Sequence, residues 1–396
     1  MANAKEIRPA FQAYNCFARV LLDLEANAKN SSLFARGCAQ IFENHDFDDW
    51  AYPYIQVFEP NLFREVAYLN DRDVDRAERF EDTLTPAGRR LRELIAYPAE
   101  LSDVWLSNTI GALISVAHFT TANELMIHLK ARSLTGQGQF ERAWLAFLIT
   151  NRCNQGADAQ VAFDEMRGAA ETGNVPTGRV LDLCTQGVVW HLKSEQINEA
   201  QFRWCLTTGA RLSKQLEHRA PETIASWYRG LAMLPAARND PKRTRAYMAK
   251  AEYNAHAAIR ADDNRGLSAL NQLKTFHESS IKEFIYVDPD YRRALKSAQE
   301  LVALDPYWPL SLAEKGEVHE RFGEHEAAAE CFERAAALGP PYVGLHLRKA
   351  ATSRLRIGDR DRALQHANTL GSIAPDSETL GEIEKVLRMH DAELRN

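Results

Sequence analysis

The stretch PLSLAEKGEVHERFGEHEAAAECFERAAALGPPY, from Pro309 to Tyr342, decides the fold. Its small and large residues are spaced as in two helices joined by a short turn. Small residues at Gly316 and Ala328 allow the two helices of such a hairpin to cross closely. The ring of Phe332 fills the space between neighbours, and Pro340 ends the second helix because proline cannot continue it. The stretch therefore predicts a packed helical hairpin.

The same spacing recurs on both sides of this hairpin. Downstream, the turn, crossing and stop positions return 35 residues later, at Gly358, Ala363 and Pro375. Upstream, the crossing and stop positions return 34 residues earlier, at Ala294 and Pro306. Self-similarity at such a period is typical of arrays of stacked helical hairpins.

This pattern resembles the tetratricopeptide repeat, a hairpin of 34 residues with small, aromatic and proline residues at fixed positions. The matching residues are Gly316, Gly323, Ala328, Phe332, Ala335 and Pro340. The resemblance covers three hairpins over about 268–376. A polar amphipathic helix over about 377–394 has the composition expected of a cap.

Composition extends the helical interpretation to the whole chain. The 396 residues are 45% hydrophobic and 26% charged, which is typical of a globular protein. Long alternations of Val, Ile and Thr, which would indicate half-buried strands, are nearly absent. We therefore predict an all-α protein, an α-solenoid of helical hairpins. It divides into a distinct helical N-terminal domain (1–135), degenerate hairpins (136–266) and tetratricopeptide-like repeats with a C-terminal capping helix (267–396).

The middle third shows hairpin-like spacing without a clean consensus. Breaks at glycines and at the Asp240-Pro241 pair separate its helices, because Asp caps a helix and Pro suits its first position. The predicted helices are Phe140–Asn154, Ala157–Thr172, Thr177–Lys193, Ile197–Leu216, Pro221–Ala237 and Pro241–Ala261.

Charge and cysteine usage narrow the function classes. The net charge is −6 with both signs mixed throughout, which argues against nucleic-acid binding as the main role. The six cysteines are scattered through apolar stretches, which fits a reducing compartment. The start has no apolar signal segment, and the apolar stretch 109–129 contains His118, Asn123, Glu124 and His128. We therefore expect a soluble, cytoplasmic protein without a membrane span.

Two polar groups are candidates for chemistry. His45, Asp46, Asp48 and Asp49 supply metal-ligand types, but a helix-capping loop explains them better because Asp favours caps and turns. Glu124 and His128 lie one turn apart on a predicted helix, where a buried or half-buried pair is expected. Motifs for phosphate, dinucleotide or nucleophilic chemistry are absent from the sequence. We therefore predict no catalytic residue, metal or cofactor, and favour a protein that is not an enzyme.

The resemblance implies a concave groove lined by the first helix of each hairpin. Carried onto this chain, the groove positions are Phe276, Ser279, Glu283, Tyr286, Glu314, Glu317, Glu320, Arg321, Arg348, Lys349, Thr352 and Arg356. Residues 306–340 carry seven Glu and three basic residues, whereas 341–375 carry six basic residues and two Asp. These opposite charges either pair with each other or contact a ligand, and the sequence alone leaves both alternatives open.

We therefore predict a non-enzymatic adaptor or scaffold that binds a protein or peptide in the groove. An acidic segment or a C-terminal carboxylate suits the basic positions, since arginine matches carboxylate geometry. Ala313 and Glu317 replace the Lys and Asn of the family's chaperone-binding clamp. Two alternatives remain. One is an enzyme, or an accessory subunit of one, with a site between the N-terminal domain and the array near Asp46, Asp48, His118 or His128. The other is a self-assembling structural protein, a homo-oligomer.

Overall fold

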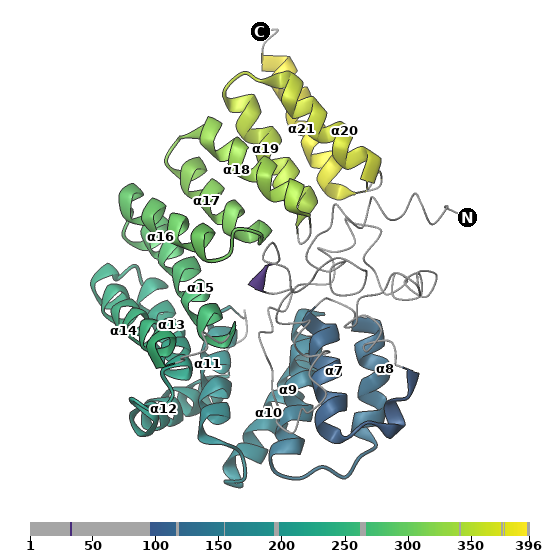
Figure 1. Cartoon of the computed structure of the whole chain (residues 1–396), viewed down its shortest axis with the longest axis vertical. Coiled ribbons are helices and arrows are strands. Elements are labelled where there is room, and N and C mark those ends of the chain that lie inside the picture. Colours follow the sequence, from purple (N-terminus) through teal and green to yellow (C-terminus); the bar gives the residue numbers. More distant parts are fainter. Residues whose placement is uncertain are drawn as a thin grey trace. The chain divides into compact units, whose positions relative to one another are not determined.

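The computed structural model describes residues 32–33, 96–115, 119–153, 155–193, 198–261, 267–339, 342–373, 375 and 377–393. These residues form helices and turns and contain no strand, which confirms the all-α prediction. Within each unit, pairs of consecutive helices pack as antiparallel hairpins, the arrangement of an α-solenoid (Figure 1). Contacts divide the chain into two compact units. Unit 1 contains residues 1–131, 148–155 and 305–396, and unit 2 contains residues 132–147 and 156–304.

Unit 2 is built from hairpins whose first helices lie side by side. After α9 (Gln137–Arg152), which both units share, come α10 (Gly156–Glu171), α11 (Thr177–Lys193), α12 (Glu199–Leu216), α13 (Pro221–Ala236), α14 (Pro241–Ala261), α15 (Leu267–Lys282) and α16 (Tyr291–Leu304). The hairpins are α11–α12, α13–α14 and α15–α16, and α13 contacts both α11 and α15. The first helices α11, α13 and α15 therefore form one continuous layer.

Glycines opposite aromatic rings hold the helices of unit 2 together. A Cβ at Gly209 would lie 2.3 Å from the ring of Trp227, and one at Gly187 would lie 2.8 Å from the ring of Phe163. Both rings are buried, with Trp227 only 1% exposed. The absence of a side chain at each glycine is what lets the large ring fill the space between helices.

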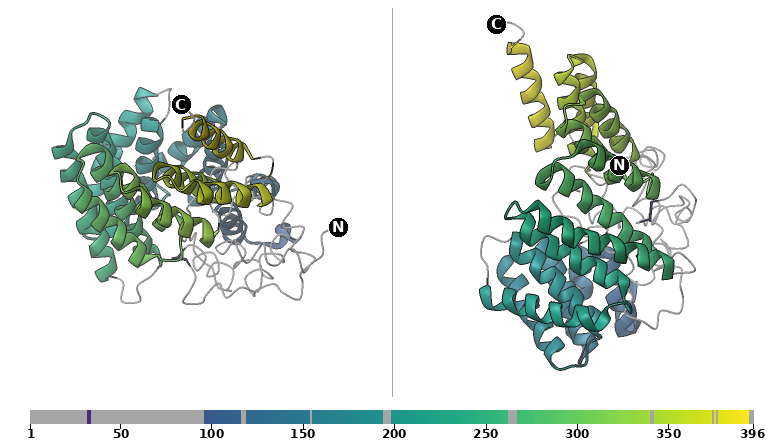
Figure 2. Two further views of the ribbon diagram at one scale, coloured as in Figure 1. Left: turned by 90° about the horizontal axis from the view of Figure 1, so that it is seen from above. Right: turned by 90° about the vertical axis from the view of Figure 1, so that its left-hand side faces the viewer.

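Unit 1 contains the remaining helices. They are α7 (Asp103–Ser115), α8 (Phe119–Lys130), α17 (Pro309–Arg321), α18 (His325–Leu338), α19 (Val343–Arg356), α20 (Arg360–Ile373) and α21 (Glu378–Glu393). Helix α18 packs against both α17 and α19, and α21 covers α19 and α20, as Figure 2 shows in a second orientation. We call α17–α21 the C-terminal helices.

The hairpin that decides the fold packs as its sequence indicates. A Cβ at Gly316 would lie 2.8 Å from the ring of Phe332, which is fully buried between Ala328 and Ala350. Gly323 adopts a positive φ of 87° in the turn between α17 and α18, a conformation that favours glycine. Helix α18 ends at Leu338, and Pro340 lies outside the described residues.

Helix bounds follow the prediction closely where local signals are strong. Helices α11 and α14 begin and end at the expected residues, and Asp240 accepts a hydrogen bond of 3.0 Å from the Arg243 amide at the start of α14. One division between the two contact units falls between Leu304 and Asp305, within the predicted repeat region 267–396, and the predicted domain boundaries stay a prediction. The hairpin α15–α16 therefore belongs with the middle helices. Most of the expected N-terminal domain, including its helices over 11–28 and 33–44, lies outside the described residues.

Candidate functional site

A cavity of about 380 Å³ lies within unit 2, against the layer of first helices. Helices α11, α13 and α15 supply most of its walls, with Thr244 and Met248 added from α14. On each first helix the lining residues recur every three or four positions, so one face of each helix is turned toward the cavity. On α11, for example, these residues are Thr185, Val189 and Lys193.

Gly230 determines how closely α11 and α13 approach at the cavity. A Cβ at this position would lie 3.1 Å from Cγ2 of Thr185 and 3.8 Å from its carbonyl oxygen. The Thr185 hydroxyl is occupied locally, since it donates a hydrogen bond of 2.9 Å to the Leu181 carbonyl. A larger residue at 230 would push the two helices apart and change the shape of the cavity.

A π-helical turn, Glu283–Val287, continues α15 along the cavity. The Asp288 amide donates to the Glu283 carbonyl, five residues earlier, at 2.9 Å. The turn buries Phe284 and Ile285 while Glu283, Tyr286 and Val287 line the cavity. Single π-turns inside helices occur frequently at functional sites, because they redirect side chains that an α-helix would place elsewhere.

Arg229 brings a positive charge into the cavity from the middle of α13. Its Nε is buried and has no hydrogen-bond partner among the described residues. Burial lowers the pKa of this guanidinium below its ordinary value, and the nearby Glu278 offsets part of that effect. An arginine held in this way is positioned to bind an anion, because a buried charge is stabilised by an opposite charge and by hydrogen bonds.

Glu283 carries the negative charge of the cavity, and an arginine already pairs with it. Its Oε2 lies 3.0 Å from Nη1 of Arg245, whereas its Oε1 is buried without a partner among the described residues. Burial raises the pKa of Glu283 to about 6, although Arg245 and Arg293 act to lower it. The charge of Glu283 is therefore largely used within unit 2.

Apolar side chains complete the walls. Val189, Met233, Met248 and Val287 line the cavity together with small residues such as Ala232 and Ala236. Methionine side chains are flexible and polarizable, so they adapt to ligands of different shape. A largely apolar cavity with a few convergent polar groups is the usual form of a binding site.

Three of the predicted groove residues line this cavity: Ser279, Glu283 and Tyr286. Phe276, on the same helix, is only 4% exposed and packs in the core with Ala225 and Met248. It therefore supports the helix layer and does not present a surface to a ligand.

The other predicted groove residues lie in unit 1 and are largely engaged with each other. Glu320 pairs with Lys349 at 3.2 Å and with Arg356 at 3.6 Å, and Arg348 pairs with Glu382 at 3.1 Å. The Thr352 hydroxyl donates to the Arg348 carbonyl. Half-buried Glu314 and Glu317 and exposed Arg321 lie on α17. Self-pairing, one of the two alternatives for the opposite charges, is thus observed for Glu320, Lys349 and Arg356, and a role of this surface in binding remains a prediction.

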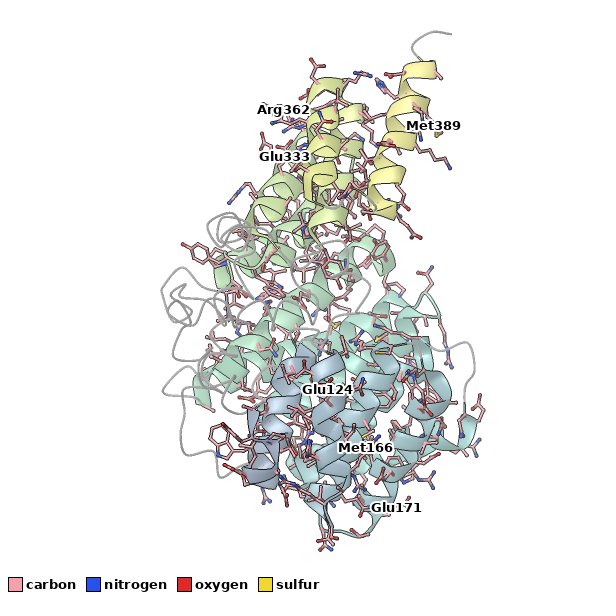
Figure 3. All side chains as sticks on the ribbon, turned by 90° about the vertical axis from the view of Figure 1, so that its right-hand side faces the viewer. Glu124, Met166, Glu171, Glu333, Arg362 and Met389 are labelled. Carbon is pink, nitrogen blue, oxygen red and sulfur yellow. The ribbon has the colours of Figure 1, made fainter. Side chains whose placement is uncertain are left out.

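The candidates for metal chemistry find no support among the described residues. Glu124, labelled in Figure 3, is exposed on α8. His128 on the same helix is exposed as well, so the expectation of a buried or half-buried pair is wrong. Within the described part of the chain, no group of three or more His, Cys, Asp or Glu side chains could hold a metal ion. His45, Asp46, Asp48, Asp49 and His118 lie outside that part.

The described cysteines behave as small hydrophobic residues. Cys184, Cys205 and Cys331 are buried, Cys153 is half-buried, and all four are free. Burial raises the pKa of the Cys205 thiol to about 12 and that of Cys184 further. Buried thiols of this kind are not reactive nucleophiles.

Sequence reasoning missed Arg229, Lys193 and Lys282, although one signal for Arg229 was present. From Thr223 to Ala236, helix α13 reads TIASWYRGLAMLPA, in which Arg229 is the single charged residue. An isolated charge in an otherwise uncharged helix is informative, because charged residues are seldom buried without a purpose.

Comparisons with known proteins leave the chain without an assigned family. No family model matches it, and no curated protein does. Among solved structures it is similar to the assembly chaperone of RpL4 (Acl4, residues 1–338), with 14% identity and a TM-score of 0.37. The match covers 74% of this chain and 98% of that chain. Likeness at this level carries no argument about function. No helix in the described ranges is long and apolar enough to cross a membrane.

Proposed function

We propose that this chain is a non-enzymatic, tetratricopeptide-like scaffold that holds a segment of a protein partner in the groove of unit 2. The observation that carries this proposal is the cavity of about 380 Å³ against the side-by-side first helices α11, α13 and α15. These helices lie two hairpins earlier in the chain than α15, α17 and α19, the helices that carry the groove positions predicted from the repeat pattern. A cytoplasmic location is part of the proposal, and the four free cysteines support it.

An extended peptide segment fits the dimensions of this layer. Packed helices lie about 8–10 Å apart, so a chain crossing three of them runs about 16–20 Å. At about 3.3 Å per residue, this distance corresponds to five or six extended residues. The alternating apolar and polar walls suit a segment whose side chains differ from one position to the next.

A blocked cavity tests the proposal. Ala236 lines the cavity at the end of α13, whereas its neighbour Ala237 is exposed and does not. Ala236→Trp should therefore fill the cavity, and Ala237→Trp serves as the matched control. The probe is a displayed library of random twelve-residue peptides, each fused to its carrier at both ends so that neither end is free. Binding peptides are selected on the immobilised full chain.

We expect selected peptides to bind the wild type and Ala237→Trp with equal affinity and to lose binding to Ala236→Trp. Circular dichroism and the unfolding midpoint of each variant show whether the fold is retained. Peptides that bind all three proteins equally would place the binding surface elsewhere. A selection that yields no binder to the wild type would contradict the proposed function.

A further inference from the structure

We propose that Arg229 binds the side-chain carboxylate of an aspartate or glutamate in an internal segment of the protein partner, with an apolar residue of that segment against Met233. This inference rests on the proposed function and specifies the chemistry that the groove recognises. Its evidence is the position of Arg229, the balance of charge in the cavity and the direction of the surrounding helices.

The position of Arg229 indicates a missing anion. The guanidinium enters the cavity from the middle of a helix that carries no other charge between Thr223 and Ala236, and its Nε is buried without a partner among the described residues. Buried polar groups in proteins nearly always have hydrogen-bond partners, so an unsatisfied one calls for an explanation. A ligand carboxylate in the cavity would accept from the two terminal nitrogens of the guanidinium, in the two-pronged geometry that arginine favours.

The balance of charge in the cavity also favours an anion. Lys193 and Lys282 line it together with Arg229, and Glu283 is its one acidic lining residue. Arg245 already pairs with Glu283, so basic residues outnumber unpaired acidic ones in the lining of the cavity. Three basic residues on the three successive helices α11, α13 and α15 match a segment that crosses all three.

The direction of the helices distinguishes a carboxylate from a phosphate. Lys193 and Ala236 are the last residues of α11 and α13, so the carboxyl ends of these two helices meet at the cavity, whereas the π-helical turn continues α15 beyond Lys282. Phosphates are usually held at the amino ends of helices, whereas carboxyl ends carry partial negative charge and repel a dianion. Arg229 lies seven residues before the end of α13, about two turns from it, where this repulsion has faded. A single carboxylate with an apolar neighbour therefore fits better.

An internal side chain is favoured over a free carboxyl terminus by the same arrangement. Lining residues continue on both sides of Arg229, to Val189 on α11 and to Val287 after α15. A segment bound in this way has residues before and after its acidic side chain, which a chain terminus would not provide.

The test uses a peptide selected as described above, with acetylated and amidated ends, and measures its Kd for the full chain by fluorescence anisotropy. In the protein, Arg229→Met removes the charge while keeping a long side chain, and Arg238→Met, at an exposed position beyond α13, is the matched control. In the peptide, the acidic residue is changed to its amide. We expect Arg229→Met in the protein and the amide substitution in the peptide each to weaken binding about tenfold or more. When these two changes are combined, Kd should rise no further. Arg238→Met should leave Kd unchanged.

The outcomes separate this inference from the proposed function. If blocked peptides bind the cavity, as shown by loss of binding to Ala236→Trp, but neither Arg229→Met nor the amide peptide shifts Kd by more than twofold, the carboxylate contact is wrong and the scaffold function stands. If only peptides with a free carboxyl terminus bind, the internal side chain is wrong. If a phosphoserine in place of the acidic residue binds more tightly than glutamate, the choice of carboxylate over phosphate is wrong. If no peptide binds the wild type, the proposed function fails first.

Discussion

Unit 2 and the C-terminal helices use the same packing of a glycine against a ring but differ in how an arginine is paired. In both regions a glycine faces an aromatic ring, Gly209 against Trp227 and Gly316 against Phe332. In the C-terminal helices Arg354 is only 2% exposed and both its Nε and Nη2 donate to Glu333 at 2.8 Å. In unit 2 the Nε of Arg229 has no partner among the described residues.

The surroundings of Glu333 show how fully the C-terminal helices use their charges. His366 on α20 also contacts Glu333, at 3.0 Å, so one carboxylate on α18 contacts side chains from both α19 and α20. Burial alone would raise the pKa of Glu333, but hydrogen bonds with Arg354 and His366 hold it below its ordinary value. In the C-terminal helices the charge of Arg354 stabilises the fold. In unit 2 the charge of Arg229 is not paired in this way and is available for a ligand.

The largest expected loss of stability comes from removing the buried aromatic ring that packs against a glycine in each region. Trp227→Ala in unit 2 and Phe332→Ala in the C-terminal helices should each lower the free energy of unfolding by about 4 kcal/mol, because each leaves a cavity behind a fully buried ring. Urea unfolding measures both. If either variant lost less than about 1 kcal/mol of unfolding free energy, the packing of a ring against a glycine would not stabilise both regions.

The paired arginine gives the next largest effect. Arg354→Met should cost about 3 kcal/mol, since it leaves Glu333 partly buried with only His366 as a partner. Urea unfolding at pH 7 gives this value, and Arg362→Met, at an exposed position on the next helix, is its control. A cost equal to that of the control would mean that the network does not stabilise the fold.

Acid should weaken both regions through buried histidines, and one in each region has a strongly lowered pKa. Burial lowers the pKa of His277 in unit 2 to about 4 and that of His346 on α19 to about 3. Because the unfolded chain takes up a proton below about pH 6.5 and these folded histidines do not, stability is present above that pH and is lost as the pH falls. Between pH 7 and pH 5 each histidine should cost about 2 kcal/mol.

The variants His277→Leu and His346→Leu isolate this effect, because every other titrating group cancels in the difference from the wild type. Each variant should show a pH dependence of unfolding about 2 kcal/mol smaller than that of the wild type between pH 7 and pH 5. An unchanged pH dependence would show that the histidine titrates normally in the folded chain.

Exposed ion pairs should give the smallest effect in both regions. Arg167 and Glu171 pair at 3.0 Å on α10, and Arg362 lies 3.6 Å from Asp359, with much of each side chain exposed (Figure 3). Glu171→Gln and Arg362→Gln should change the free energy of unfolding by less than about 0.5 kcal/mol. A larger loss of stability in one region would mean that its exposed ion pairs, and not only its buried ones, stabilise the fold.

The sequence predicted those features of the fold that depend on residues close together in the chain. The bounds of α11 and α14 depend on caps and breaks within a few residues, and the contact between Gly316 and Phe332 lies within one hairpin. The division between contact units after Leu304 is not visible in the sequence, because the repeat period continues across it. Nothing in the local pattern marks which hairpins form a common unit.

The candidate site was only partly predictable for the same reason. Ser279, Glu283 and Tyr286 follow from the spacing of one helix, but the cavity brings together Lys193, Arg229 and Lys282 from three hairpins. Whether a buried arginine meets a glutamate, as Arg354 does, or remains unsatisfied, as the Nε of Arg229 does, depends on such distant neighbours.

The most direct test compares Arg229→Met with Arg354→Met in two measurements, the free energy of unfolding and the Kd for a blocked acidic peptide selected on the wild type. The account predicts that Arg229→Met weakens peptide binding about tenfold and changes stability by less than about 1 kcal/mol, because a buried charge without full pairing adds little to folding. Arg354→Met should lose about 3 kcal/mol of stability and, where folded, bind the peptide normally. The reverse pattern, with Arg229→Met unfolded and Arg354→Met unable to bind, would contradict the account.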